Sequence, residues 1–228
     1  MPGTPAISLK RAAKLKAKKH REVERLFIAE GTASLDEAPT PPLQVFDKVE
    51  QLSRVSTLQT PAGPVGVFPF LDVEPAELLA SVPRIVLLHG VQDPGNVGTA
   101  IRSAHAFGAG VALSRGTADL YNPKTVRATM GSIFHTPVAR ELASVDFLAT
   151  AADAGFAVAA AVAAAGDTPQ GLPRGRLIVC IGAEGPGLPE EVLSACEVRV
   201  RIPSLAPSLN ASVAASILLY EAYSRVLT

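Results

Sequence analysis

Residues 84–108 read Arg84-Ile-Val-Leu-Leu-His-Gly-Val-Gln-Asp-Pro-Gly-Asn-Val-Gly-Thr-Ala-Ile-Arg-Ser-Ala-His-Ala-Phe-Gly108. The stretch opens with an apolar run of strand length, Arg84–His89, and continues into a loop over residues 90–98. Helical character follows over Asn96–Phe107 and ends at Gly108, because glycine commonly ends helices. This stretch therefore predicts one strand–loop–helix unit.

The same alternation of strand and helix continues toward the C-terminus. Strands are predicted over Val111–Leu113, Phe156–Val162, Leu177–Ile181 and Val198–Ile202, and helices over Pro123–Gly131 (with Asn122 as N-cap), Phe147–Ala154, Pro189–Ser194 and Ser208–Arg225. Because several strands are continuous apolar runs, we predict an α/β fold in which helices cover both faces of a mostly parallel sheet. Ligands of such sheets bind at loops after the strands, here residues 90–98, 182–188 and 203–210.

The N-terminal residues 1–80 hold shorter elements. They are a basic helix within residues 8–30 that leads into the apolar run Leu26–Ala29, turns at 38–42 and 60–64, a short helix over Asp47–Leu52 and a strand over Val65–Leu71. This part is too small for a large core of its own. We therefore expect a small α/β region in front of the larger domain.

Charge is unevenly distributed along the 228 residues, although the chain has no net charge. Residues 1–25 hold eight basic and two acidic side chains, a net charge of +6, and the remaining chain carries −6. Neutrality excludes a uniformly basic nucleic-acid-binding protein, but the basic segment favours a polyanionic partner for an N-terminal arm. A solvated, charged helix has the same composition, and charge alone does not decide between the two.

Composition and cysteine content indicate a globular protein of a reducing compartment. Hydrophobic residues make up 48% and charged residues 18%, which excludes disorder over most of the chain. Cys180 and Cys196 fit no metal or redox motif and lie in apolar runs that predict burial. The longest apolar run, Phe156–Ala165, is too short to cross a bilayer, and no apolar segment makes the basic N-terminus a secretory signal. We expect a cytoplasmic protein with no membrane partner.

Common nucleotide, metal and hydrolase motifs are absent from the sequence. It holds neither G-x-G-x-x-G nor G-x-S-x-G. Two glycine pairs have P-loop spacing, Gly90 with Gly95 and Gly182 with Gly187, but neither is followed by the lysine that contacts phosphates. The histidines are scattered, so no metal site is predicted.

Five polar residues remain, all at strand-to-helix junctions. They are Asn96 and Arg102 on the first loop–helix unit, Glu184 in the glycine-rich loop, and Ser208 and Asn210 before the last helix. Each alone can be explained as a helix cap, a loop carboxylate or a surface side chain. Because they lie on three loops at one edge of the predicted sheet, together they indicate a site.

The segments around these residues resemble a known family. They are Leu88–Gly108, Ile178-Val-Cys-Ile-Gly-Ala-Glu-Gly-Pro-Gly-Leu188, Arg201–Glu221 and Asn122–Phe134. Over about residues 83–226 the sequence resembles the SpoU/TrmH family of the SPOUT superfamily, the knotted RNA 2′-O-methyltransferases. The resemblance implies a methyltransferase domain over residues 83–228 with a C-terminal trefoil knot. It also implies a homodimer with the active site near the interface.

The resemblance further implies S-adenosylmethionine as cofactor, held in a bent form by the second and third segments. Its expected contacts are Gly182, Gly187, Ile202, Leu209 and Ala211. The loop from Ile202 to Leu209 is two residues shorter than is usual in the family, so contacts from residues 203–207 are not carried over.

Catalytic roles also follow from the resemblance. Arg102 would deprotonate the ribose 2′-hydroxyl or, because the pKa of arginine lies above about 12, stabilise the developing alkoxide as a cation. Asn96 would orient Arg102 or the ribose, and Glu184 and Asn210 would shape the pocket. Ser208 would hydrogen-bond a phosphate or the ribose.

The N-terminal region resembles the family's RNA substrate-binding domain in Lys18–Gly31 and in Val45–Gly66, but the usual middle of that domain is missing. We therefore expect a shortened substrate-binding domain over residues 26–80 and a basic arm, residues 1–25, that carries more of the RNA contact. Phosphates would be bound by Lys14, Lys16, Lys18, Lys19, Arg21 and Arg127.

The resemblance thus predicts an S-adenosylmethionine-dependent RNA (ribose-2′-O)-methyltransferase, and its N-terminal part favours rRNA as substrate. A tRNA ribose methyltransferase is one alternative. A non-catalytic knotted protein that binds RNA or assists ribosome assembly is another, motivated by the shortened domain and loop. A base methyltransferase fits less well, because Asn96 and Arg102 belong to the ribose-modifying branch.

Overall fold

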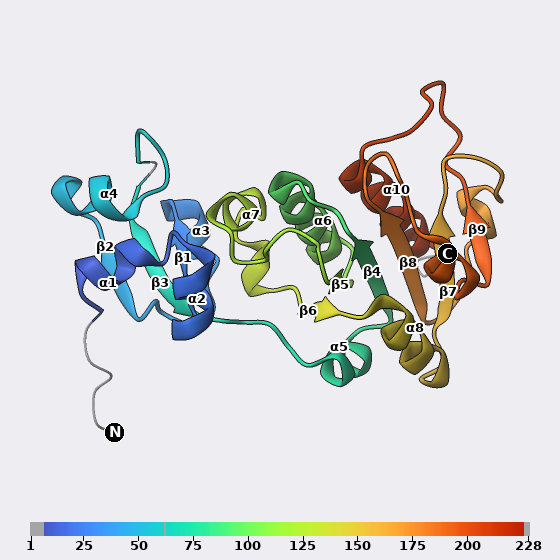
Figure 1. The fold of residues 1–228 in the computed structure, drawn as a ribbon, viewed down its shortest axis with the longest axis horizontal. Helices are drawn as coiled ribbons and strands as arrows, with labels where there is room; N and C mark the ends of the chain where they lie inside the picture. Colours follow the sequence, from blue (N-terminus) through green and yellow to red (C-terminus); the bar gives the residue numbers. More distant parts are fainter. Residues whose placement is uncertain (1–6, 62, 226–228) are drawn as a thin grey trace.

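The strands of the chain form two sheets (Figure 1). A computed structural model describes residues 7–61 and 63–225. In this part of the chain a three-stranded antiparallel sheet has the order β1-β3-β2, and a six-stranded sheet has the order β6-β5-β4-β8-β7-β9. All pairings of the larger sheet are parallel, which confirms the predicted α/β class.

The larger unit, from β4 to α10, alternates strands and helices as predicted. Its strands are β4 (Arg84–His89), β5 (Gly110–Ser114), β6 (Val138–Leu142), β7 (Ala157–Ala161), β8 (Leu177–Gly182) and β9 (Val198–Val200). Its helices are α6 (Pro94–Ala106), α7 (Pro123–Ala128), α8 (Ser144–Asp153), α9 (Glu190–Ser194) and α10 (Ala211–Ser224), and α5 (Pro75–Ser81) precedes it. Helix α5 and strand β6 were not predicted, since α5 is only about two turns long and β6 is an edge strand with polar residues.

Two cores lie on opposite faces of the larger sheet. Helices α6, α7 and α10 cover one face, toward which β4 directs Val86 and Leu88. Helices α5, α8 and α9 cover the other face, which receives Ile85 and Leu87. Cys180 is buried in this second core, and Cys196 packs against it; neither forms a disulfide. Helices therefore cover both faces, as expected.

Several helix boundaries differ from the predictions, and at the starts of α6 and α10 a capping side chain explains the difference. Helix α6 begins at Pro94, since the Asp93 carboxylate accepts hydrogen bonds from the amides of Gly95 and Asn96. Helix α10 begins at Ala211 rather than at Ser208, since Asn210 is its N-cap. The trefoil knot stays a prediction. None of the described helices is both long and apolar enough to cross a membrane.

The N-terminal unit, from α1 to β3, has a core of its own. Its elements are α1 (Leu9–Lys14), α2 (Lys18–Glu24), β1 (Leu26–Glu30), α3 (Thr32–Asp36), β2 (Gln44–Phe46), α4 (Val49–Val55) and β3 (Val65–Pro69). The prediction of one continuous basic helix was wrong, because the chain turns between α1 and α2 and buries Leu15. Ala12 and Leu15 pack with Leu52 and Val55, so this part of residues 1–25 is no free arm. The predicted shortening of residues 26–80 relative to the family stays a prediction.

Close packing of α6 on α7 gives a stability test at Gly98. A Cβ at this position would lie 2.5 Å from the Ala128 Cβ and 2.5 Å from the Thr125 carbonyl oxygen. We expect Gly98→Ala to lower the free energy of unfolding by about 1–3 kcal/mol, measured by urea denaturation. The control Thr150→Ala changes an exposed residue of α8 and should stay within about 0.5 kcal/mol of the parent. Equal denaturation midpoints for both variants would contradict the close contact.

Candidate active site

A cavity of about 510 Å³ lies at the carboxyl ends of β7, β8 and β9. Its walls are the loops that follow these strands and the first turn of α10. All five residues expected to contact the cofactor line it, namely Gly182, Gly187, Ile202, Leu209 and Ala211. The parallel sheet therefore brings together segments that lie far apart in the sequence.

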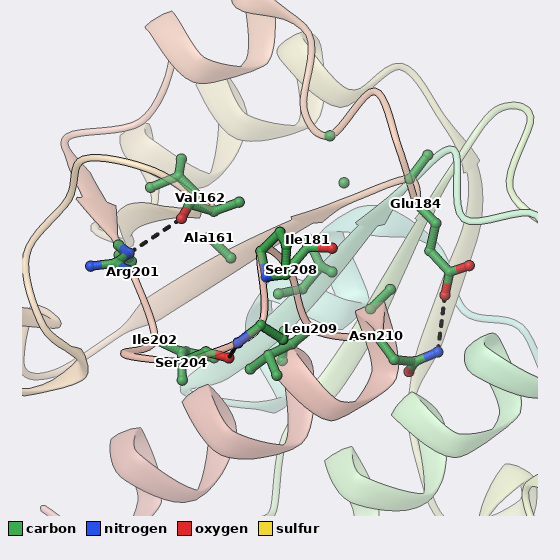
Figure 2. Close-up of a pocket in the computed structure, with 18 of the residues that line it drawn as sticks. Ala161, Val162, Ile181, Glu184, Arg201, Ile202, Ser204, Ser208, Leu209 and Asn210 are labelled. Atoms are coloured by element: carbon green, nitrogen blue, oxygen red, sulfur yellow. Dashed lines mark hydrogen bonds between the residues drawn. The ribbon is translucent and has the colours of Figure 1, made fainter.

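The cavity combines an apolar middle with charged ends. Figure 2 shows Ile181, Ile202 and Leu209 between two charged side chains, Arg201 on one side and Glu184 on the other. Arg201 is held by a 3.2 Å hydrogen bond from its Nε to the Ala163 carbonyl. Such a lining suits a ligand that has an apolar or aromatic body and polar substituents.

Asn210 fixes the polar end of the cavity because its side-chain oxygen caps α10. Its Oδ1 accepts hydrogen bonds from the amides of Ser212 (3.0 Å) and Val213 (3.3 Å). The amide nitrogen must then point away from the helix, and it donates to Glu184 Oε1 and to Asn96 Oδ1, both at 2.9 Å. In Figure 2 a dashed line between the labelled side chains of Asn210 and Glu184 marks this contact.

The orientation of the Asn210 amide also fixes which atoms of Asn96 accept and donate. Since its Oδ1 accepts from Asn210, its Nδ2 is left to donate to Glu184 Oε1, at 2.7 Å. Ser212 is only 5% exposed. Its hydroxyl donates to Asn210 Oδ1 at 2.7 Å and lies 3.3 Å from Asn96 Oδ1. Asn96, Glu184 and Asn210 therefore form one hydrogen-bonded cluster, which we call the polar triad.

Helix α6 carries Asn96 to the triad. Its capping carboxylate, Asp93, is bound by Lys124 at 2.9 Å. The hydrogen bond from Lys124, followed by that from the Asn96 amide, lowers the pKa of Asp93, so the cap stays ionised at neutral pH. Helix α6 also contacts α10 directly, since Ser103 Oγ and Ser216 Oγ lie 2.6 Å apart.

Two other expected catalytic residues are placed differently. Ser208 lines the cavity, but it is exposed in the loop before α10 and lies outside the triad. Arg102 is exposed on α6, about 120° around the helix from Asn96, and does not line the cavity. No hydrogen bond or ion pair among the described residues includes its guanidinium. The structure thus does not bring Arg102 to the cavity of its own chain.

Several lining residues were not predicted from the sequence. Ala161 ends β7, Val162 and Ala163 follow it, and Arg201 and Ser204 follow β9. The strand predicted over Phe156–Val162 was the available signal, because its carboxyl end had to lie at the same edge as the other loops. Ser212 was missed because it looks like an ordinary helix residue.

The expected phosphate-binding residues fall into two groups. Lys14, Lys16, Lys18 and Lys19 are exposed, and Lys18 lies 3.4 Å from Glu141. The structure contradicts the prediction for Arg21, which is only 3% exposed because it donates to the Leu15 and Lys16 carbonyls and pairs with Asp119. Arg127 is partly enclosed as well, since it donates to Thr57 and lies 3.7 Å from Glu30.

Titratable groups elsewhere near the strand ends do not add a metal centre. Within the described part of the chain, no group of three or more His, Cys, Asp or Glu side chains is arranged to hold a metal ion. His89 is the last residue of β4 and lies 2.8 Å from Ser144 Oγ. Burial lowers its pKa despite the charge of Glu191, so the imidazole is neutral at pH 7.

An open parallel sheet with a cavity at its strand ends defines a ligand-binding α/β protein, and comparison with known proteins specifies the kind. The family model described as the SpoU rRNA Methylase family matches residues 83–220. The chain belongs to this family.

Individual relatives extend the comparison. Over 153 residues, 64% of this chain and 60% of the relative, it is 40% identical to the 23S rRNA (guanosine(2553)-2'-O)-methyltransferase RlmP of Bacillus subtilis (strain 168). The chain therefore spans about 60% of the length of this curated relative. The structure of an AdoMet-bound rRNA methyltransferase from Sinorhizobium meliloti has a TM-score of 0.85 and 30% identity, covering 96% of this chain and 95% of that one. The structure of a putative RNA methyltransferase of the TrmH family from Porphyromonas gingivalis has a TM-score of 0.83 and 29% identity, covering 97% of this chain and 99% of that one.

Gly182 offers a direct test of the cavity. A Cβ here would lie 2.2 Å from the Gly187 carbonyl carbon and 2.4 Å from the Leu188 nitrogen, so the loop would have to move. We expect Gly182→Ala to weaken S-adenosylmethionine binding by about 100-fold or more, measured by isothermal titration calorimetry. Pro186→Ala, at an exposed position of the same loop that does not line the cavity, should weaken binding far less. Parent-like affinity of Gly182→Ala would show that this loop does not hold the cofactor.

Proposed function

We propose that this chain is an S-adenosylmethionine-dependent RNA (ribose-2′-O)-methyltransferase that acts on rRNA. The observation that carries the proposal is the polar triad at the mouth of a cavity built by the family's own segments. Relatives whose names specify rRNA and a 2′-O product support the substrate and the reaction. An rRNA substrate also supports a cytoplasmic location, where ribosomes are assembled.

The cavity fits S-adenosylmethionine in size and chemistry. Its volume of about 510 Å³ lies in the range of about 300–1,000 Å³ that is usual for drug-sized ligands. Ile181, Ile202 and Leu209 offer an apolar bed for an adenine ring, and backbone at Gly182 and Gly187 allows close approach. Glu184 can attract the positive charge of a sulfonium. When bound, this cofactor supplies an electrophilic methyl group.

The chain's residues then position and activate the ribose. The site would hold the ribose 2′-oxygen in line with the methyl group that the cofactor supplies, and the 2′-hydroxyl proton would leave to solvent as the methyl group is transferred. The polar triad holds Glu184 and Asn96 in one orientation at this point, so that little reorganisation is needed. Arg102 stabilises the developing alkoxide as a permanently charged donor.

A homodimer supplies Arg102 from the partner chain. Residues Val213, Ile217 and Tyr220 form an exposed apolar stripe on α10, at positions i, i+4 and i+7 of one helix face. Arg102 is exposed on α6, which packs directly against α10. We name the surface formed by Arg102 and this stripe the α6/α10 face. A second copy bound there would cover apolar side chains and bring Arg102 toward a neighbouring cavity.

Methyl transfer tests the function directly. We expect label from S-adenosylmethionine to appear in a 2′-O-methyl nucleoside of unmodified rRNA and not of tRNA. Arg102→Ala should lower kcat by about 100- to 1,000-fold with little change in cofactor affinity. The control Arg115→Ala removes another exposed arginine, outside the proposed site, and should retain activity. Label in tRNA alone would overturn the substrate, and cofactor binding without transfer to any RNA would overturn the activity.

Mixing two inactive variants tests the dimer. Arg102→Ala keeps an intact cavity, and Gly182→Ala keeps Arg102. If Arg102 acts in the partner's site, mixed dimers contain one complete site and should recover up to about one quarter of the parent activity. Ile217→Asp, which places a charge on the α6/α10 face, should give monomers in analytical ultracentrifugation. Monomeric parent protein, or no recovery from a mixture shown to exchange subunits, would contradict the proposal.

A further inference from the structure

Polar and charged contacts join the N-terminal unit to the larger unit at several points. The pairs are Lys18–Glu141, Arg21–Asp119, Glu22–Arg140, Glu30–Arg127 and Glu37–His135. The first three include residues of α2, the helix that also carries two of the exposed lysines. Helix α2 is therefore attached to the larger unit by its own side chains.

Arg140, on the edge strand β6, makes the most complete of these contacts. Its guanidinium donates to both carboxylate oxygens of Glu22, at 2.8 and 3.1 Å. Its Nε lies 3.1 Å from Asp72 Oδ2, and its side chain is 12% exposed. The same guanidinium lies over the rings of Phe70 (5.0 Å) and Tyr121 (5.5 Å). A partly buried, two-pronged arginine pair of this kind fixes geometry as well as charge.

The connection between the two units is held at the same place. Tyr121, fully buried, accepts hydrogen bonds at its hydroxyl from the amides of Leu71 and Asp72. The hydroxyl donates to Asp72 Oδ1 at 2.6 Å. The ring of Phe70 stacks on that of Tyr121 with centroids 3.8 Å apart and an interplanar angle of 12°. The segment that connects β3 to α5 is thus held against the larger unit through Tyr121.

The protonation states of Asp72, Arg140 and Tyr121 at neutral pH are the ones that these contacts need. Burial favours a higher pKa for Asp72, but the hydrogen bond from Tyr121 and the charge of Arg140 outweigh it and lower that pKa. Burial acts to lower the pKa of Arg140, yet its hydrogen bond with Glu22 and the charge of Asp72 raise it. Burial and the bond to Asp72 raise the pKa of Tyr121. The carboxylate, the guanidinium and the hydroxyl therefore all keep the forms that these contacts need.

This attachment bears on RNA binding because the lysines and the cavity lie far apart. Helices α1 and α2 are at one end of the long axis in Figure 1, and β7, β9 and the cavity loops are at the other. An RNA that reaches both must bridge the length of the molecule. A fixed distance between the two contact regions lowers the entropy lost when the second one binds.

On the basis of the proposed function, we propose that Arg140 is a positioning residue for the RNA substrate. It holds α2, and with it the surface formed by Lys14, Lys16, Lys18 and Lys19, at a fixed place relative to the cavity. The partner it serves is a folded RNA long enough to contact both regions. A short oligonucleotide that reaches only the mouth of the cavity gains nothing from Arg140.

The test compares Arg140→Ala with the matched variant Arg176→Ala. Arg176 also lies over an aromatic ring, Phe156 at 4.1 Å, and donates to backbone carbonyls, but all its contacts are within α5 and the larger unit. For Arg140→Ala we expect KM for a long rRNA transcript to rise about tenfold, with kcat and cofactor affinity unchanged. KM for a short oligonucleotide substrate should not change. Arg176→Ala should leave both KM values unchanged, whatever its melting temperature.

A double-mutant cycle separates positioning from general destabilisation. In a background with Lys14, Lys16, Lys18 and Lys19 all changed to glutamine, Arg140→Ala should cause no further increase in KM, because the lysines it positions are gone. Full additivity, or an unchanged KM for the long transcript, would overturn the proposal. If Arg140→Ala does not fold, Glu22→Gln tests the same contact with the shape retained. If the parent protein does not transfer methyl groups to any RNA, that result counts against the proposed function and not against the attachment of α2 by Arg140.

Discussion

The N-cap of α10 is the contact on which the arrangement of the site depends. Helix amides need an acceptor at their free end, and Asn210 Oδ1 satisfies two of them. These two hydrogen bonds leave only the amide nitrogen of Asn210 to face the cavity mouth. The nitrogen orients Asn96, and together the amides of Asn210 and Asn96 give Glu184 Oε1 two donors. An ordinary rule of helix capping thus sets the polarity of the whole triad. Aspartate at position 210 would still cap the helix, but it would place a negative charge against Glu184.

Much of this site could be predicted from the sequence. Continuous apolar strands alternating with helices predict a parallel sheet, and a parallel sheet brings its strand ends to one edge. That reasoning reached Glu184 and Asn210 and the loops that carry them. The loop after β7 was left out although the same rule applied to it. Arg102 shows the limit of the approach, because membership of one helix with Asn96 does not specify which way a side chain points.

The N-terminal unit shows a different limit. Charge counting treated Lys14, Lys16 and Arg21 alike, although the structure exposes the lysines and buries the arginine. A buried arginine needs a nearby carboxylate, and the partner here, Asp119, lies 98 residues further along the chain. No local pattern around Arg21 contains that information. The break between α1 and α2 was likewise hidden, because Leu15 looks like one more apolar residue on a helix and is instead anchored in a core formed with α4.

The exposed Arg102 and the apolar stripe of α10 lie on two helices that pack against each other. Helices α6 and α10 approach closely because serines meet between them, at Ser103 and Ser216, so their outer sides form one continuous surface. Helix α10 carries the apolar stripe and α6 carries the exposed Arg102, and exposed apolar side chains of this size cost free energy in water. In the proposed homodimer, a partner chain would remove the apolar side chains from water and would give the arginine a function. It would also supply a second lysine surface, so the reach of the dimer along a folded RNA need not be limited to one chain's length.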